Sequence, residues 1–455
     1  MIKRSSLLLL PSLLVISACT MAPHYERPAA PVADTWSPPV QTQADAQLHW
    51  RALFTDPALQ KTIELALANN RDFRVAALNI QRARAQYGIE RANLLPALDG
   101  SVGGTKSHSD ANGDNETWNA NLGLSWELDL FGRIRSLKNA ALEDFFASQE
   151  NRNAVAISLI ASTADAWLGL AADQDILAVT QQTYTTRKDA YDIAVGKAKI
   201  GVLSDLDLNQ AKTLMEQARG DVAAAQTQID QDKAALTLLT GATVPDDLLP
   251  AGLQDTMVAD ALPVGLPSDV LHKRPDVLAA EHGLKAANAD IGAARAAFFP
   301  TISLTGALGS ASGALGDLFK SGNNTWSYGT QLGVPIFAGG ANINGLRSAK
   351  AGRDIAVAQY EGAVQSAFND VSQALAVRAR IDERLDAQTS ANDAAQTSLR
   401  LSQARYDSGT DSYLTLLDAQ RTAYQSQQQL ISLRALKATN LVALYRALGD
   451  DESLN

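Results

Sequence analysis

The chain has 455 residues, and its 39 Lys and Arg against 49 Asp and Glu give a formal net charge of −10. This balance argues against nucleic-acid binding, which needs Lys and Arg clustered on one surface, and no basic stripe is visible in the sequence. The length allows two or three average domains, and a single cysteine excludes an internal disulfide.

The N-terminal residues predict export. A basic start leads into an apolar run over residues 7–16, which is too short to cross a bilayer and is typical of a secretory signal. Small residues directly before Cys19 resemble a bacterial lipobox, so we expect removal of residues 1–18 and a lipid on Cys19. By the same resemblance, Thr20 in place of an acid favours the outer membrane. The alternative is an ordinary signal peptide that contains a cysteine.

Residues 19–56 are expected to form a lipidated tether. Prolines recur through residues 22–47, and a proline-rich segment adopts an extended backbone that does not fold into a helix. We therefore expect an extended connection from the lipid to the first helix.

The two halves of the remaining chain repeat one another. The matched residues, offset by 204, are Asp72 and Asp276, Gly88 and Gly292, Arg91 and Arg295, and Pro96 and Pro300. Such a long period indicates one duplicated supersecondary unit and not a solenoid. The expected organisation is repeat 1 over 57–241, a linker over 242–267, repeat 2 over 268–449 and a tail over 450–455.

Each repeat is expected to contribute two strands. Apolar and polar or small residues alternate from Ala120 to Leu130, and again from Trp326 to Ile336. A weaker alternating stretch precedes each run, and a loop rich in Gly, Asn and Ser separates the two. The predicted strands are 97–106, 118–130, 300–309 and 326–337. An outer-membrane barrel requires strands with one apolar and one polar face, although a half-buried soluble sheet has the same pattern.

The helices favour the membrane barrel. Residues 133–198 and 340–407 contain no proline and would each extend about 100 Å at about 1.5 Å per residue. Shorter helices are expected on either side of each long one, over 58–94 and 205–240 in repeat 1 and over 268–298 and 412–448 in repeat 2. Two short helices stacked end to end would match the length of one long helix. Apolar and small residues at spacings of three and four in the return helix indicate coiled-coil packing.

One stretch of the long helix could be taken for a transmembrane helix. Residues 154–172 contain a single charge, Asp165, whereas the equivalent stretch at about 362–380 contains three. Equivalent units should not occupy different solvents, so we expect a packed helix here.

Four strands cannot close a barrel, because bacterial barrels need at least about eight. A dimer would supply eight strands, and a trimer would supply twelve with a wider lumen.

Three runs of sequence carry a family resemblance. They are Leu-His-Lys-Arg-Pro-Asp at 271–276, the run from Ala286 to Pro300, and Tyr-Leu-Thr-Leu-Leu-Asp-Ala-Gln-Arg at 413–421. With the lipobox and tether, they closely resemble the lipoprotein branch of the TolC-like outer-membrane factors, typified by OprM and NodT. The likeness covers essentially the whole mature chain.

The resemblance implies a membrane α+β fold. The expected assembly is a trimeric channel-tunnel, with a twelve-stranded β-barrel built from four strands per chain and continued by a long periplasmic α-helical coiled-coil barrel. It implies an outer-membrane exit channel of a tripartite efflux system, which passively conducts drugs or other small toxic compounds. The implied partners are a periplasmic adaptor, an inner-membrane pump of the resistance-nodulation-division class, and outer-membrane lipid.

Two helical hairpin tips are expected to face the adaptor. Their residues are Gly201, Val202, Leu203 and Ser204 in repeat 1, and Ser408, Gly409, Thr410 and Asp411 in repeat 2. Glycine and capping residues at these places suit the reversal of a helix. Asp205 and Asp207 would add negative potential that favours cations, or would simply complement a helix N-terminus.

A gate is expected just beyond the second tip. Leu414, Asp418 and Arg421 share one helix face. The spacing alone fits a solvated surface ion pair. The family resemblance implies a periplasmic constriction, with three Asp418 carboxylates around the lumen, Arg421 tethering helices and Leu414 as an apolar collar.

An enzyme is not expected, and neither a cofactor nor a metal is. The five histidines form no close ligand set, and no phosphate-binding loop, nucleophile elbow or dinucleotide fingerprint is present in the sequence. Two other functions stay open: an outer-membrane channel for type I protein secretion, and a lipid-anchored periplasmic coiled-coil scaffold without a pore.

Overall fold

The computed structural model describes residues 20–36, 49–111, 113–259, 264, 267–449, 451 and 454. Cys19 lies outside them. The chain divides into two compact units, and both halves of the sequence contribute to each. The first unit is Met1–Ala30, Leu78–Glu150 and Leu278–Ala363, and the second is Pro31–Ala77, Asn151–Val277 and Val364–Asn455.

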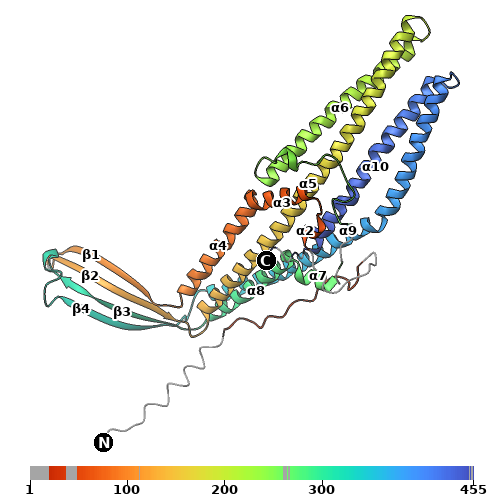
Figure 1. Cartoon of the computed structure of the whole chain (residues 1–455). Helices are drawn as coiled ribbons and strands as arrows, with labels where there is room; N and C mark the ends of the chain where they lie inside the picture. Colours follow the sequence, from red (N-terminus) through yellow and green to blue (C-terminus); the bar gives the residue numbers. More distant parts are fainter. Residues whose placement is uncertain are drawn as a thin grey trace. The chain divides into compact units, whose positions relative to one another are not determined.

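The duplication appears as helices of matched length (Figure 1). α4 (Arg71–Ala92) and α8 (Pro275–Ala296) have 22 residues each. α5 (Arg133–Lys199) and α9 (Ala341–Asp407) have 67 residues each, and α6 (Asp205–Thr240) and α10 (Tyr413–Leu448) have 36 each. The shorter elements are α2 (Trp50–Leu53), α3 (Pro57–Asn69), η2 (Asp246–Leu248), α7 (Pro267–Lys273) and η3 (Leu315–Asp317).

The first helix of each repeat is broken, where the sequence predicted one continuous helix. In repeat 1 the break is at Asn70, whose side-chain oxygen accepts a hydrogen bond from the Phe73 backbone N–H at 2.9 Å and so caps α4. In repeat 2 the break is at Arg274, because Pro275 has no N–H to continue α7 and suits the first position of a new helix.

The strands form one antiparallel sheet in the order β1-β2-β3-β4. They are β1 (Ala97–Ser109), β2 (Gly113–Leu128), β3 (Thr301–Ser312) and β4 (Asn324–Gly333). β2 pairs with β3, so the two repeats join in the middle of the sheet. β4 ends at Gly333, before the predicted limit, and Pro335 beyond it cannot donate to a ladder.

The predicted loop between the first two strands is largely strand. Lys106 pairs with Glu116, and His108 pairs with Asp114. The imidazole Nδ1 of His108 also lies 2.6 Å from an Asp114 carboxylate oxygen. Low β-propensity of Gly, Asn and Ser suggested a loop, but the ladder and this cross-strand contact extend the hairpin.

The second unit contains the larger apolar core. Trp167 on α5 belongs to one buried cluster with Phe54, Leu236 and Tyr445, which come from three other parts of the chain. α5 is the one helix among the described residues that is long and apolar enough to cross a membrane, and 61% of that window is buried in the protein. Its apolar surface is therefore used in packing.

Candidate channel face and periplasmic gate

The sheet has one apolar and one polar face. Residues paired across antiparallel strands lie on the same face. The register gives an apolar row of Gly100, Leu122, Leu308 and Trp326, and beside it a row of Leu98, Leu124, Gly306 and Tyr328. The opposite face includes the row of Ser101, Asn121, Gly309 and Thr325.

The apolar face is open in the single chain. Leu308 is 64% exposed, Trp326 73% and Tyr328 82%, and the two aromatic rings stack with centroids 6.0 Å apart. Such an apolar surface is unfavourable in water and is what a lipid-facing sheet presents. The sheet ends at β1 on one side and at β4 on the other, and neither edge pairs with a further strand of the described residues.

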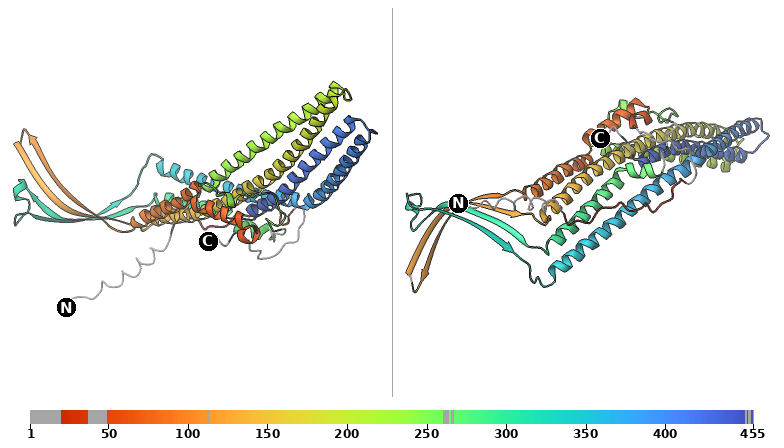
Figure 2. Two further views of the ribbon diagram at one scale, coloured as in Figure 1. Left: turned by 45° about the horizontal axis from the view of Figure 1, so that its top comes forward. Right: turned by 90° about the horizontal axis from the view of Figure 1, so that it is seen from below.

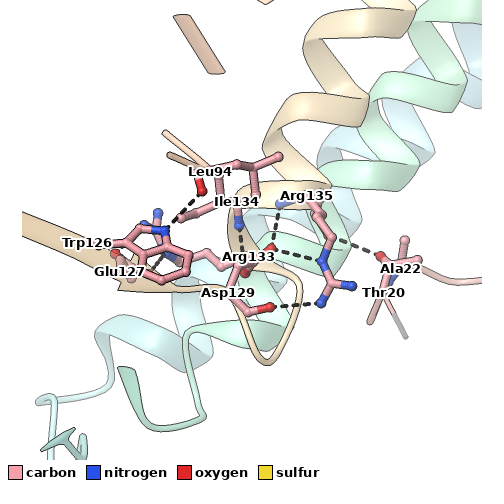
Figure 3. A network of polar contacts seen from close by, with 10 residues as sticks. Thr20, Ala22, Leu94, Trp126, Glu127, Asp129, Arg133, Ile134 and Arg135 are labelled. Carbon is pink, nitrogen blue, oxygen red and sulfur yellow. Dashed lines mark hydrogen bonds and ion pairs between the residues drawn. The ribbon is translucent and has the colours of Figure 1, made fainter. Parts of the chain in front are cut away.

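A polar network fixes the junction between β2 and α5 (Figure 3). The Asp129 carboxylate accepts hydrogen bonds from the backbone N–H groups of Ile134 and Arg135, at 3.1 and 2.9 Å, and so caps α5. The guanidinium of Arg133 forms a two-pronged ion pair with Glu127. Every charge here has an opposite partner, so the sheet enters the helix through a rigid, neutral junction.

The two hairpin tips share one backbone design. Gly201 and Gly409 have φ of 76° and 75°, the left-handed conformation in which glycine is favoured. After each glycine, a backbone N–H returns to the last turn: Val202 donates to the Lys197 carbonyl and Thr410 to the Arg405 carbonyl. These bonds satisfy helix-end carbonyls and reverse the chain.

The tips differ in their side chains. Ser204 caps α6, as its hydroxyl accepts from the Asp207 N–H at 3.1 Å. In repeat 2 the capping residue is Ser412, one position beyond the predicted turn. Asp411 instead accepts two hydrogen bonds from the Arg405 guanidinium, at 2.7 and 2.8 Å. These bonds hold the pKa of Asp411 below its usual value.

A small cavity of about 200 Å³ lies between the two hairpins. Tyr406 and Tyr413 line it with ring centroids 5.4 Å apart, and the Lys197 ammonium lies 5.6 Å from the Tyr406 ring. Asp189, Asp207 and Asp407 also line it. Aromatic rings, one lysine and three acids therefore line the cavity between the tips.

The predicted gate residues lie on one exposed face of α10. Leu414 is 65% exposed, and Asp418 and Arg421 are also exposed. Within the described part of this chain, Asp418 and Arg421 form no ion pair with each other. Their role in a gate therefore stays a prediction that concerns contacts with other copies of the chain.

Sequence reasoning missed a buried arginine near this face. Arg187 on α5 is 7% exposed, donates to the Leu214 carbonyl at 3.3 Å and lies 5.7 Å from the Tyr424 ring. Burial lowers its pKa, and the nearby positive charge of Arg421 acts in the same direction. A lone arginine on a long helix gives no signal of burial in the sequence. Among the described residues, no group of three His, Cys, Asp or Glu side chains could hold a metal ion.

Comparisons with known proteins agree with this geometry. The family description "Outer membrane efflux protein" matches residues 62–242 and 266–450. The chain is 44% identical to the probable efflux pump outer membrane protein TtgC of Pseudomonas putida, over 96% of this chain and 93% of that protein. It is 40% identical to the outer membrane protein OprJ of Pseudomonas aeruginosa, over 96% and 94%.

The chain also superposes on solved structures of outer-membrane channels. The open state of the Neisseria gonorrhoeae MtrE outer membrane channel superposes with a TM-score of 0.86 at 42% identity, covering 95% of this chain and 98% of that one. The outer-membrane channel OprN superposes equally well at 29% identity.

Proposed function

Since the chain belongs to the outer membrane efflux protein family and is an outer-membrane exit channel of a tripartite efflux system, we propose that it works as a homotrimer. Three copies would supply twelve strands, enough for a barrel with an open lumen, whereas the four strands of one chain cannot close. The observation that carries this proposal is the sheet with an exposed apolar face and two unpaired edges.

The helices support closure between copies. In the right-hand view of Figure 2, α4, α5, α8 and α9 run side by side, with α4 and α9 outermost. Apolar side chains on both outer helices are about half exposed in one chain: Leu78 and Ile89 on α4, and Ile343 and Ile355 on α9. In a ring of three copies, α4 of one copy would pack against α9 of the next. A native mass in detergent equal to three chains is expected, and a stable single chain with full β content would contradict it.

The cargo and partners follow by analogy. Relatives are described as efflux components for antibiotics, toluene and solvents, so we propose small toxic organic compounds as cargo. An adaptor would dock at the hairpin tips, where Tyr406 and Tyr413 line the cavity between the two hairpins. An inner-membrane pump of the resistance-nodulation-division class would supply the energy, and the channel would conduct the cargo passively.

A lipid on Cys19 would help to hold the channel in the membrane. The adjacent Thr20 lies at the start of α5, with its hydroxyl 3.2 Å from the Ser136 hydroxyl, and Ser136 follows the β2–α5 junction closely. Mass spectrometry of the mature N-terminus is expected to show a diacylglyceryl-modified Cys19, and an unmodified terminus would contradict it.

Leu414, Asp418 and Arg421 are proposed to close the periplasmic end. Three copies of each would face one another on the exposed α10 faces, and ionic contacts repeated by threefold symmetry would hold the closed state. The double variant Asp418→Ala with Arg421→Ala should raise single-channel conductance in planar bilayers and sensitise cells to large antibiotics, with an unchanged trimer yield. Asp393→Ala, an exposed acid of α9, is the control. Unchanged conductance with an intact trimer would exclude this gate.

A further inference from the structure

The N-terminal segment is bound along α8, where the sequence predicted only an extended connection. Residues 20–30, which we call the strap, follow α8 (Figure 2). The Arg295 guanidinium donates to the Met21 carbonyl at 2.9 Å, and the Asn288 amide donates to the Pro23 carbonyl at 2.8 Å. Further along, the buried Glu281 carboxylate accepts from the Tyr25 hydroxyl and from Arg27.

The α8 residues that receive the strap form one stripe. They are Glu281, Lys285, Asn288, Gly292 and Arg295, at spacings of four and three, so they share one helix face. Gly292 lets the strap approach, because a Cβ there would lie 2.7 Å from the Ala22 nitrogen and 2.6 Å from the Ser136 hydroxyl oxygen. The stripe is thus a receptor for an extended polypeptide.

The duplication places the same stripe on α4, offset by 204 residues. Its members are Ala77, Gln81, Arg84, Gly88 and Arg91, and all are exposed. A Cβ on Gly88 would meet nothing within 4 Å. The side chains of Arg84 and Arg91 form no hydrogen bond or ion pair within the described residues. Repeat 1 therefore keeps the glycine and a donor at both carbonyl-binding positions, but no strap lies on it among the described residues.

We propose that the α4 stripe binds an extended, acidic polypeptide segment of a partner protein. Among the described residues the one strap already occupies α8, so we assign the segment to a partner protein. Charge decides its chemistry: Glu281, which pairs with Arg27 of the strap, is replaced by Ala77, and Asn288 is replaced by Arg84. The α4 stripe thus has two positive charges and no negative one, and complementary acids favour binding.

This inference rests on the proposed trimer. On α8 the second wall of the groove is α5, through Ser136. The residue that corresponds to Ser136 at the later offset of 208 is Asn344 on α9, and α9 of the next copy would form the second wall beside α4. The trimer would then have three grooves filled by straps and three open to a partner.

The test uses a fluorescent peptide with the sequence of residues 20–30 and two changes. Met21→Glu places an acid beside Arg91, and Arg27→Glu makes the α8 stripe reject the peptide because Glu281 would face it. Fluorescence anisotropy with the full-length trimer at low salt should show saturable binding of one peptide per chain. The double variant Arg84→Glu with Arg91→Glu should weaken binding at least about tenfold, and Gly88→Trp should abolish it.

The matched control is Gly220→Trp, because Gly220 is also an exposed helical glycine with nothing within 4 Å of a Cβ. It should leave binding unchanged. Equal binding by the Gly88→Trp protein, or no saturable binding by the wild type, would overturn the proposal. So would a Gly88→Cys trimer that resists maleimide without peptide, because a neighbouring copy would then cover the stripe. Native mass is measured on the same samples, so failure of the trimer is recognised separately.

Discussion

The two repeats have helices of identical lengths but hold them in different ways. α4 and α8, α5 and α9, and α6 and α10 match residue for residue in length. In repeat 1 the Asn70 amide donates to the Leu239 carbonyl near the end of α6, at 2.8 Å. In repeat 2 the Arg274 guanidinium donates to the equivalent Ala447 carbonyl of α10, at 2.6 Å. In both repeats a side chain at the helix break donates to a carbonyl near the end of the return helix, but the side chain is an amide in one repeat and a guanidinium in the other.

The difference extends to charge. Arg274 also pairs with Asp276 and Asp370, so it ties α8, α9 and α10 together, whereas Asn70 is neutral. At the sheet-to-helix junctions, the ion pairs are in repeat 1. Repeat 1 has the ion-paired junction around Asp129, whereas repeat 2 enters α9 through Pro335 and two left-handed glycines, Gly339 and Gly340. The two repeats therefore share their helix lengths but differ in the polar contacts at the helix breaks and at the sheet-to-helix junctions.

Removing the buried arginine should have the largest effect. Arg274 is 6% exposed, so Arg274→Ala would remove the charged donor of two partly exposed carboxylates and of a helix-end carbonyl, at a cost of about 2 to 3 kcal/mol. Asn70→Ala should cost about 1 kcal/mol, as expected for loss of a helix cap. Thermal unfolding followed by the helical circular dichroism signal would compare them. Equal losses would show that the ionic contacts of Arg274 add nothing.

Much of this skeleton could be predicted from the sequence. Long stretches without proline give α5 and α9, and alternation gives four strands, because both signals are local. The breaks at Asn70 and Arg274 were missed, since helical residues continue on both sides of each. Only Pro275 offered a local signal of the second break.

The sites were less predictable, because they depend on contacts between distant segments. The tip glycines follow from local turn chemistry. In contrast, the burial of Arg187 and Glu281 depends on which helix or strap packs against them, and no pattern around either residue indicates it. The gate residues need contacts between copies, so their pairing stays a prediction.

Gly292 on α8 and Gly88 on α4 occupy equivalent positions, but only Gly292 contacts the strap. Gly292→Ala would place a methyl group against the strap and Ser136, and such overpacking costs about 1 to 3 kcal/mol. The strap should detach, and limited proteolysis should cut within residues 20–30 much faster. Gly88→Ala has open space and should instead stabilise α4 by up to about 1 kcal/mol, because alanine is the better helix former. Similar proteolysis of both variants would refute a specific role of Gly292.

Two neighbouring acids, Asp173 and Asp232, are expected to make the stability of repeat 1 depend on pH. Burial, followed by the adjacent Asp232, raises the pKa of Asp173 to about 6. In repeat 2 the equivalent residues are Ile381 and Asn440, which do not titrate. A raised carboxyl pKa stabilises the fold below the unfolded value, about 4, and this contribution is lost as the pH rises through 6.

Asp232→Asn, which copies the residue of repeat 2, should therefore reduce the loss of stability between pH 4 and pH 7 by less than about 1 kcal/mol, because burial, the larger cause of the raised pKa, remains and both carboxyls are partly exposed. Urea midpoints across this range are the measurement. Asp165→Asn is the comparison, because burial raises the pKa of Asp165 to about 6 without a second acid. An unchanged pH dependence in Asp232→Asn would show that the two acids do not share a proton.

The smallest effect is expected at the hairpin tips, where only repeat 2 has an ionic clasp. The residues equivalent to Arg405 and Asp411 in repeat 1 are Lys197 and Leu203, which form no such pair in the described structure. Both clasp residues are on the surface, so Asp411→Asn should leave global stability nearly unchanged. It should loosen the turn, because two charge-assisted hydrogen bonds from Arg405 become weaker. Hydrogen exchange of the Gly409 and Thr410 amides should quicken, while the amides of Gly201 and Val202 serve as the internal control. Acidification below the lowered pKa of Asp411 should quicken the same amides relative to that control in the wild type, since a carboxyl with a depressed pKa loses its contribution only when it is protonated. If the two tips respond alike, the clasp does not order the second turn, and the backbone design built on glycine is sufficient for both.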